Sequence, residues 1–287
     1  MTLRDLIVYG QNLLKDSGIE DYESDTRILA MFAFGINYTD MFMKMSEDMP
    51  DDSIDFYKNC LDLRCEHVPC QYITGSQEFM GYEFITEEGV LIPRQETEIL
   101  VEKALELTSG IKECKALDMC TGSGCIGISY ELKRREAGFN NDTIHLADIS
   151  DDALAVADKN KYKLNSKCKI IKTDLFEKIV DRYDIIMSNP PYIKTSDIDE
   201  IMEEVREYEP RLALDGDSDG LSYYRKIAAK AVKYLYKNGI LFLEIGYEQY
   251  EDVRDMLLTY GFSDVSVIKD YSGLDRVVVA YATEHDY

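Results

Sequence analysis

The sequence reads YDIIM over residues 183–187 and continues directly into SNPPY over residues 188–192. A short run rich in apolar residues is typical of a buried strand. The two prolines end that strand because each lacks an N–H and fixes φ, and Asn189, which precedes a proline, is held extended. The pattern therefore predicts a rigid polar tip at the carboxyl end of a strand, where open α/β sheets bind their ligands.

Asn189, Pro190, Pro191 and Tyr192 are the candidate catalytic residues of this tip. The Asn189 side-chain oxygen and the Pro190 carbonyl can accept both hydrogens of a planar NH2 group, while the Tyr192 ring stacks on its flat face. This arrangement favours alkylation of an amine or amide nitrogen, because positioning and electrostatics supply most of the catalysis in such a reaction. A proline-stiffened turn after a core strand is the simpler alternative.

The composition indicates one large and one small domain in a globular protein. The chain has 287 residues, of which 45% are hydrophobic and 30% charged, and no apolar run is long enough to span a membrane. The net charge of −23 disfavours a nucleic-acid substrate and favours a protein or small-molecule partner. The amino-terminal stretch lacks the continuous apolar segment of a signal peptide, so we expect a cytoplasmic protein without membrane association.

The cysteines and histidines argue against several kinds of site. Seven cysteines are scattered without a secretory signal, so reduced thiols are expected. Cys60, Cys65, Cys70 and His67 lack the close pairs of a zinc site, and no metal is expected. None of the three histidines lies near a plausible nucleophile, which disfavours hydrolysis by a catalytic triad.

Residues 1–74 predict a small helical bundle, and residues 75–287 predict a larger α/β domain. Short aromatic and β-branched runs broken by glycines predict a connecting hairpin over residues 75–92. Asp25 or Ser24 is the expected cap of the second helix. Helical spacing in the first segment is carried by Leu3, Leu6, Ile7, Leu13, Leu14, Ile28, Leu29, Met31, Phe32, Ile54, Tyr57 and Leu61.

The larger segment alternates strands and helices. Because helices separate the first five strands, these should be parallel, whereas only a short turn joins the last two, which should be antiparallel. We therefore predict a Rossmann-like, seven-stranded mixed sheet of the α/β class. The expected strands cover residues 114–119, 143–149, 167–173, 183–189, 239–245, 262–270 and 276–283.

A glycine-rich loop, ALDMCTGSGCIG at 116–127, follows the first of these strands. Gly122 and Gly124 let the backbone approach a ligand closely, and Gly127 permits close packing of a helix on a strand. The G-x-G-x-x-G spacing alone would also suit NAD. The residues of this loop predicted to bind a cofactor are Cys120, Thr121, Gly122, Ser123 and Gly124.

Acidic residues at strand ends help to distinguish between NAD and S-adenosylmethionine as the cofactor. Asp148 can accept hydrogen bonds from a ribose diol, which NAD and S-adenosylmethionine both carry. Asp118 would repel a pyrophosphate but could hold the ammonium of an amino-acid-bearing cofactor, directly or through water, so S-adenosylmethionine fits better. Asp174 closes the third strand in a similar way. Leu175 and Phe176 could cover an adenine, although ordinary core positions explain them as well.

Seven blocks of sequence together resemble the PrmC (HemK) family, the release factor glutamine N5-methyltransferases. The resemblance runs from about residue 70 to residue 280, and SNPPYI and EPRLALDG are its most specific parts. The blocks are IPRQETE at 92–98, DMCTGSGCIGIS at 118–129, ADIS at 147–150, TDLFE at 173–177, SNPPYI at 188–193, YEPRLALDGDSDGLSYYRKI at 208–227 and LEIGYEQ at 243–249.

The resemblance implies a helical substrate-recognition domain joined by a hairpin to a class I methyltransferase domain. It implies S-adenosylmethionine bound by residues 120–124, Asp148, Leu175 and Asn189, and a substrate glutamine held by residues 189–192. The implied reaction is methylation of the side-chain nitrogen, N5, of the glutamine in the GGQ motif of class-1 peptide-chain release factors.

Two positions depart from the family pattern. Cys120 stands where the loop usually has its first glycine, so the backbone there must accept a Cβ or the loop must adjust. Gln95 stands where the family's PRPETE segment has its second proline. The EPRLALDG block has no full physical explanation, and Glu209 and Arg211 are expected either to form an ion pair beside the tip or to lie on the surface.

Other functions share parts of this pattern. A glutamine methyltransferase of a ribosomal protein would have the same tip, and only the first domain could separate the two. An adenine or guanine N-methyltransferase of nucleic acid would hold its amine in the same way, but the acidic charge opposes it. An NAD-dependent oxidoreductase would share the glycine loop, and a binding module would keep the fold without the tip.

Overall fold

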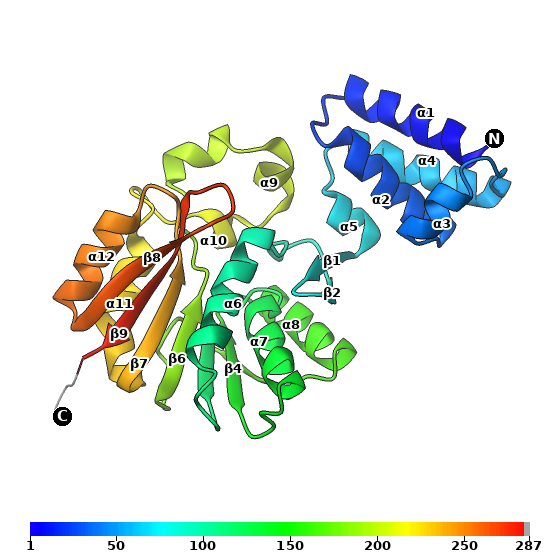
Figure 1. Ribbon diagram of the computed structural model, residues 1–287. Coiled ribbons are helices and arrows are strands. Elements are labelled where there is room, and N and C mark those ends of the chain that lie inside the picture. Colours follow the sequence, from blue (N-terminus) through cyan, green and yellow to red (C-terminus); the bar gives the residue numbers. More distant parts are fainter. Residues whose placement is uncertain (284–287) are drawn as a thin grey trace. The chain divides into compact units, whose positions relative to one another are not determined.

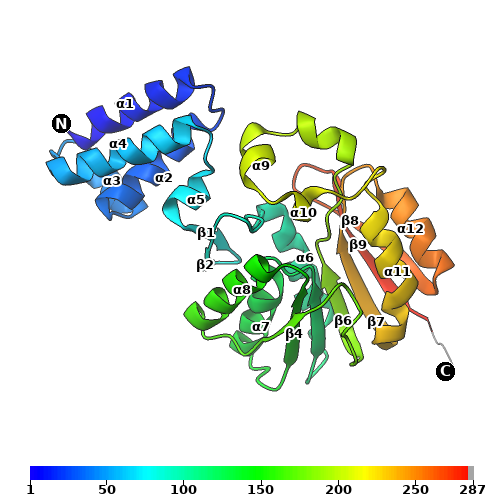
Figure 2. The ribbon, with the colours of Figure 1, turned by 180° about the vertical axis from the view of Figure 1, so that it is seen from behind.

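The computed structural model describes residues 1–283, which form two compact units (Figures 1 and 2). The first unit holds residues 1–76 together with the short segment 202–208. The second holds residues 77–201 and the described residues from 209 onward. Segment 202–208 is therefore grouped with the first unit although its sequence neighbours on both sides belong to the second. No helix in the described part of the chain is long and apolar enough to cross a membrane.

The first unit is a helical bundle. Thr2 and Asp5 form a capping box at its first helix, in which each side chain accepts from the backbone N–H of the other residue. Its buried core includes Leu6, Leu29 and Tyr57, which come from three different helices. The helices are α1 (Leu3–Asp16), α2 (Tyr22–Phe34), α3 (Tyr38–Met43), α4 (Asp51–Cys65) and α5 (Cys70–Thr74), together with α9 (Glu203–Tyr208).

The expected cap of the second helix is wrong. Helix α2 begins at Tyr22, so Asp21 occupies the cap position and Asp25 lies inside the first turn. The Asp25 carboxylate is buried and accepts a hydrogen bond from Arg64 Nε at 2.7 Å. Arg64 also forms an ion pair with Glu204 of α9. Asp25 is thus held by a buried charge from a distant helix, which local spacing does not reveal.

The second unit is built on a mixed sheet of seven strands in the order β5-β4-β3-β6-β7-β9-β8, which confirms the predicted fold class. The strands β3 to β7 run parallel, and β9 is antiparallel to both β7 and β8. The strands are β3 (Lys115–Met119), β4 (Thr143–Asp148), β5 (Lys169–Lys172), β6 (Tyr183–Ser188), β7 (Leu235–Glu244), β8 (Phe262–Lys269) and β9 (Asp275–Ala282). A separate two-stranded sheet pairs β1 (Ser76–Phe79) with β2 (Tyr82–Ile85).

Helices cover both faces of the large sheet (Figures 1 and 2). Successive residues of β6 point to opposite faces, so Ile185 and Met187 join one core and Ile186 joins the other. Helices α6 (Glu98–Leu107), α7 (Cys125–Glu136) and α8 (Asp151–Lys163) contribute to the first core, and α11 (Ser222–Tyr234) and α12 (Tyr250–Thr259) to the second. The turns η1 (Gln95–Thr97) and η2 (Thr195–Glu200) and the short helix α10 (Arg211–Leu214) complete the described elements.

The strand order fixes where the chain can build a site. From β3 the chain moves outward through β4 to β5, and it then returns to place β6 on the opposite side of β3. The connections that leave the carboxyl ends of β3 and β6 therefore diverge to opposite sides of the sheet. Such a reversal opens a crevice at the carboxyl edge, which is where open α/β sheets bind ligands.

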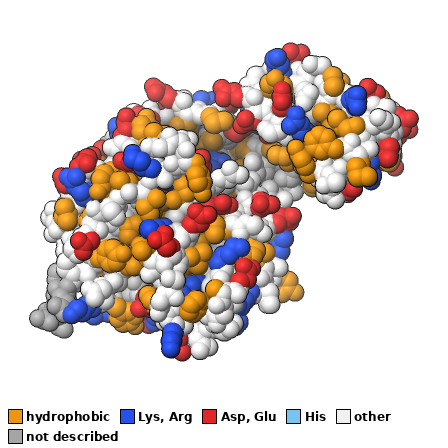
Figure 3. Space-filling view, in the orientation of Figure 1, with side chains coloured by type: hydrophobic (Ala, Val, Ile, Leu, Met, Phe, Trp, Pro, Cys, Tyr) orange, Lys and Arg blue, Asp and Glu red, His pale blue; other side chains and the backbone are white. Residues whose placement is uncertain are grey.

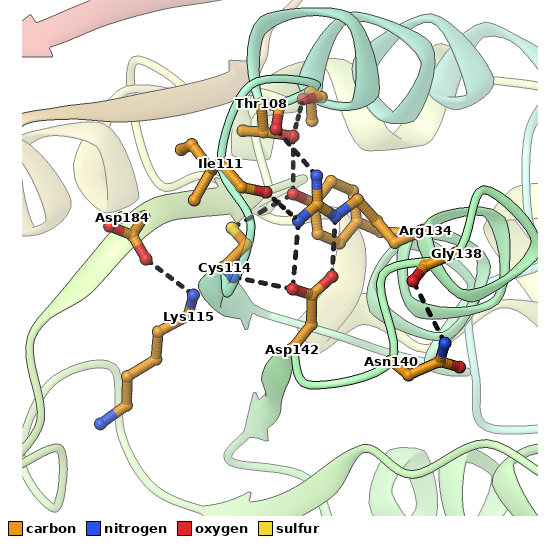
Figure 4. A network of polar contacts seen from close by, with 11 residues as sticks. Thr108, Ile111, Cys114, Lys115, Arg134, Gly138, Asn140, Asp142 and Asp184 are labelled. Carbon is orange, nitrogen blue, oxygen red and sulfur yellow. Dashed lines mark hydrogen bonds and ion pairs between the residues drawn. The ribbon is translucent and has the colours of Figure 1, made fainter.

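A buried ion pair supports the amino-terminal end of β3 (Figure 4). Arg134 of α7 contacts both carboxylate oxygens of Asp142, at 2.7 and 3.1 Å, and both side chains are almost fully buried. Two further N–H groups donate to the carbonyls of Thr108 and Ile111. Asp142 also accepts from the Cys114 backbone N–H at 2.7 Å. Four of the five N–H donors of the guanidinium are therefore paired with protein acceptors.

This network predicts a large loss of stability when one partner is removed. Arg134→Met should lower the free energy of unfolding by about 3–5 kcal/mol, because Asp142 would remain buried as an uncompensated charge. Arg254→Met, at a partly exposed arginine of α12, is the matched control and should change it by less than about 0.5 kcal/mol. Urea unfolding followed by far-UV circular dichroism measures both. Equal effects of the two substitutions would contradict the prediction.

Candidate functional site

A cleft opens at the carboxyl ends of β3, β4 and β6. It encloses about 570 Å³, part of it open to solvent, and its wall includes Cys120, Gly122, Asp148, Asn189 and Pro191. Three segments far apart in the sequence thus meet at one edge of the sheet, as the strand order requires. An adjoining pocket shares Cys120, Gly122 and Asn189 with the cleft and adds Thr121 and Ser123.

The backbone of the glycine-rich loop adopts a tight conformation close to the sheet. Cys120 has a φ of 59°, so it adopts the left-handed conformation that a glycine would take there at lower cost. The backbone thus accommodates the Cβ of Cys120, which stands where the family pattern has glycine. Gly127 is packed so tightly that a Cβ would lie 2.3 Å from Leu146 and 2.9 Å from the Asp118 Cβ. Only glycine allows α7 to pack at this distance.

Asp118 lies behind the loop and has no exposed surface. Its Oδ2 accepts hydrogen bonds from the Thr121 hydroxyl at 2.5 Å and from the Gly127 N–H at 2.9 Å, which brace the loop and the start of α7. Its Oδ1 is buried and has no hydrogen-bond partner among the described residues. Burial raises the pKa of Asp118 to about 7.

Asp148 is the last residue of β4 and forms part of the cleft wall. Its two oxygens accept from the backbone N–H groups of Gly122 and Ser150, each at 2.9 Å. A carboxylate oxygen has more than one lone pair, so both retain acceptor capacity toward a ligand. Burial raises the pKa of Asp148 despite these hydrogen bonds.

Asn189 stands at the junction of the cleft and the adjoining pocket. Its Nδ2 donates to the Thr97 hydroxyl oxygen at 3.4 Å, and its Oδ1 accepts no hydrogen bond from any residue that the structure describes. Pro190 and Pro191 are buried, which keeps the tip rigid. The amide oxygen of Asn189 is thus an acceptor available to a ligand.

Tyr192 lies apart from the cleft. It lines a different pocket together with Gly246, Gln249 and Arg276. Its hydroxyl donates to Glu244 Oε1 at 3.4 Å, and its backbone carbonyl accepts from Gln249 Nε2 at 3.0 Å. Burial and the nearby Glu244 charge raise the pKa of the Tyr192 hydroxyl, which therefore remains protonated.

Four predicted cofactor residues do not line the cleft or the adjoining pocket: Asp118, Gly124, Asp174 and Leu175. Gly124 caps α7 with a φ of 84°. Asp174 is exposed beyond the end of β5, and Leu175 is buried in the second core beside Phe176. The Phe176 ring stacks on the Tyr234 ring, with 4.7 Å between the ring centroids. Phe176 is therefore an ordinary core residue, which was the alternative to its covering an adenine.

The ion pair considered for the EPRLALDG block is wrong. Glu209 is buried and pairs with Arg94, and it also accepts from the Ile92 N–H at 3.4 Å. Arg211 instead forms an exposed pair with Asp215. The Glu209–Arg94 pair joins this block to the segment before α6. Sequence distance hid this contact, because the two residues are 115 positions apart.

Sequence reasoning also missed the apolar wall of the cleft. Tyr223 lies in the LSYYRKI stretch and lines the cleft together with Cys120 and Gly122 of the loop. The family resemblance spans these residues but implied no role for them. The only signal in the sequence was that EPRLALDG is one of the most specific parts of that resemblance. The missed apolar and proline residues are Val90, Leu91, Ile149, Ala153, Pro210, Leu212, Ala213 and Tyr223.

Two family models match the chain. Residues 5–75 match the PrmC N-terminal domain, and residues 94–217 match the methyltransferase small domain. The matched ranges cover the helical bundle and most of the site described above.

Solved structures share the fold at low sequence identity. The catalytic domain of hMettl16, solved in complex with the MAT2A 3′UTR hairpin 6, superposes with a TM-score of 0.56 at 17% identity and covers 83% of this chain and 84% of that one. The 16S rRNA N2 G1207 methyltransferase of T. thermophilus, solved with AdoMet and guanosine, gives 0.51 at 17% identity, covering 72% and 49%. These likenesses concern the fold alone.

Curated relatives align along nearly the whole chain. The release factor glutamine methyltransferase of Clostridium acetobutylicum is 36% identical over 98% of both chains. That of Clostridium botulinum is 37% identical over 98% of this chain and 99% of its own, and that of Geobacter sulfurreducens is 35% identical over 96% and 95%. The resemblance read from the sequence is confirmed, and the chain belongs to the release factor glutamine methyltransferase family.

Proposed function

We propose that this enzyme transfers a methyl group from S-adenosylmethionine to N5 of the glutamine in the GGQ motif of class-1 release factors. The observation that carries the proposal is Asn189, whose amide oxygen is unpaired among the described residues at the junction of the cleft and the adjoining pocket. A hydrogen-bond acceptor held there suits a primary amide, which must present its NH2 group toward the cofactor. The family relationship supplies the protein that carries this amide.

The residues present fit S-adenosylmethionine. Asp148 offers acceptors for a ribose diol at the cleft wall, and the backbone of Gly122 is held beside it at 2.9 Å. Asp118 Oδ1 is a buried acceptor without a partner among the described residues, and such atoms are rare unless a ligand or water completes them. Because Asp118 lines neither pocket, we propose that a buried water links this oxygen to the cofactor's ammonium group. When bound, S-adenosylmethionine supplies an electrophilic methyl group on a sulfonium.

Asn189 and Pro190 would hold the substrate amide by its two hydrogens. An amide nitrogen is a weak nucleophile because its lone pair is delocalised, so fixing its position is the main catalytic contribution of these residues. The buried prolines keep the acceptors in place without an entropic cost at the moment of reaction. Tyr192, which lines a different pocket, is assigned no contact with the amide, and its hydroxyl is held by Glu244.

We propose that the first unit recognises a second surface of the release factor. It presents exposed aromatic side chains, among them Phe32 and Phe56, whose rings lie 5.6 Å apart. Figure 3 shows apolar side chains gathered on the visible face of this unit, among acidic and basic ones. Exposed apolar patches of this kind mark protein contacts. Contacts on this surface would add affinity without taking part in the chemistry.

Because release factors act in translation, the proposed place of the reaction is the cytoplasm.

The cofactor assignment predicts the effect of Asp148→Ala. Loss of a charged acceptor for the ribose should weaken S-adenosylmethionine binding roughly tenfold to a hundredfold. Isothermal titration calorimetry measures the dissociation constant, and circular dichroism checks the fold. Asp158→Ala, at an exposed acid of α8, is the control and should bind the cofactor as the unmodified enzyme does. Unchanged affinity in a folded Asp148→Ala variant would place the ribose elsewhere.

The substrate assignment predicts the effect of Asn189→Ala. Turnover should fall by a factor on the order of 10² or more, because the reacting nitrogen loses one of its two fixed acceptors. Single-turnover transfer of a labelled methyl group measures this, with cofactor affinity determined in parallel. Asn140→Ala, at an exposed asparagine, should keep normal turnover. Near-normal turnover of Asn189→Ala would mean that another group orients the amide.

The two-surface proposal predicts a preference for the intact substrate. A glutamine that enters a narrow site must lie on a flexible loop, and the glycines of GGQ supply that freedom. The enzyme should methylate intact release factor much faster than an isolated GGQ peptide. Incubation of both with labelled cofactor, followed by mass spectrometry, locates the label. Label on ribosomal protein or nucleic acid, with the release factor unmodified, would overturn the proposed function.

A further inference from the structure

Glu244 is a buried glutamate next to the catalytic tip that the proposed chemistry does not use. It ends β7, whose Leu243 pairs in register with Ser188 of β6, so its side chain lies beside the residues that follow β6. Only 2% of its surface is exposed, and it forms no ion pair with a described residue. A carboxylate buried in this way is costly to the fold unless its hydrogen bonds matter.

Two hydroxyl groups donate to this carboxylate. The Thr97 hydroxyl, itself buried in η1, donates to Glu244 Oε2 at 2.6 Å, and the Tyr192 hydroxyl donates to Oε1 at 3.4 Å. Thr97 is also the residue whose hydroxyl oxygen accepts from Asn189 Nδ2 at 3.4 Å. Glu244, Thr97 and Asn189 therefore form one chain of hydrogen bonds that ends at the Asn189 amide, which is proposed to hold the substrate.

The direction of this chain follows from the number of protons available. An ionised carboxylate only accepts, so the single hydroxyl hydrogen of Thr97 must be donated to Glu244. The Thr97 oxygen is then only an acceptor toward Asn189, which must turn its NH2 group to Thr97. Because the amide is planar with oxygen and nitrogen on opposite branches, its oxygen must face the substrate side.

We propose that Glu244 and Thr97 are positioning residues that determine which way the Asn189 amide faces, an inference that rests on the proposed function. If the Thr97 hydrogen were free, it could be donated to Asn189 Oδ1, and the amide could reverse. Asn189 would then present NH2 to the NH2 group of the substrate. Two donors that face one another form no hydrogen bond, and the reacting nitrogen would lose its acceptor.

The protonation state of Glu244 is set by several surrounding groups. Burial raises its pKa to about 7, and the Glu96 charge on η1 raises it as well. The Thr97 hydroxyl, the Arg276 charge from β9 and the Tyr192 hydroxyl lower it. Arg276 is itself engaged by Asp270 at 3.0 Å, so it does not neutralise Glu244 directly. As the pH falls through about 7, Glu244 takes up a proton and ceases to impose the direction of the chain.

The experiment compares the pH dependence of kcat in the full-length enzyme and in Glu244→Gln, with saturating cofactor and intact release factor. In the unmodified enzyme kcat should fall as the pH drops below about 7. Glu244→Gln keeps the shape but can present either oxygen or NH2 to Thr97. Its kcat should be roughly tenfold to a hundredfold lower at pH 8, should not fall further at lower pH, and should leave the cofactor dissociation constant unchanged.

Substitutions at Thr97 test the same chain at its middle. Thr97→Ser keeps the hydroxyl, so this variant should have the same kcat and pH profile as the unmodified enzyme. Thr97→Val keeps the shape but not the hydroxyl, so its kcat should fall as that of Glu244→Gln does. Because both act through one chain, Thr97→Val combined with Glu244→Gln should be no slower than Thr97→Val alone. Glu131→Gln, at a buried glutamate of α7 remote from the cleft, is the matched control and should change neither kcat nor its pH profile.

The outcomes separate this inference from the proposed function. An unmodified enzyme that places no label on the release factor would overturn the proposed function and the inference with it. If the unmodified enzyme is active but Glu244→Gln has normal kcat, or keeps the decline below pH 7, the inference alone is overturned. The decline would then belong to another group, such as Asp118, whose pKa burial also raises to about 7. Additive losses in the double variant would equally contradict a shared chain.

Discussion

The placement of the whole site depends on one close contact, the packing of α7 against β3 at Gly127. No side chain fits there, because a Cβ would lie 2.3 Å from Leu146. The short distance lets the Gly127 N–H reach Asp118, which in turn accepts from the Thr121 hydroxyl. The loop is thereby fixed from below, and Gly122 is brought to Asp148 on the neighbouring strand. A looser helix would leave the loop without its buried anchor.

The site also concentrates buried acids whose folded-state pKa is raised. Asp118 and Glu244 both reach about 7, mainly through burial. An acid whose pKa is higher in the folded state binds its proton more tightly there, so its contribution to stability is present at low pH and is lost as the pH rises from about 4 to about 7. At neutral pH these residues therefore reduce the stability of the fold. Perturbed acids of this kind cluster at functional sites.

Local sequence patterns predicted the helices and strands, but they did not reveal the contacts between segments that are distant in the sequence. The apolar run of β6, its proline stop, the glycine loop and Asp148 could be placed because each is encoded within a few residues. The partner of Glu209 could not, because Arg94 lies 115 positions away. Thr97 lies in the IPRQETE block, and nothing in that block shows that its hydroxyl lies between Asn189 and Glu244. The grouping of residues 202–208 with the first unit was likewise invisible to periodicity.

The left-handed Cys120 places a thiol in the wall of a cleft proposed to hold an alkylating agent. A thiolate is a far better nucleophile than a carboxamide, so an ionised cysteine at this position would compete with the substrate and inactivate the enzyme by self-alkylation. Burial and the Asp148 charge raise the pKa of Cys120, and burial raises that of Cys125 in the adjoining pocket to about 12. Both sulfurs therefore stay protonated. The same acidic, desolvated surroundings that suit a cationic cofactor also raise the pKa of the two thiols beside it.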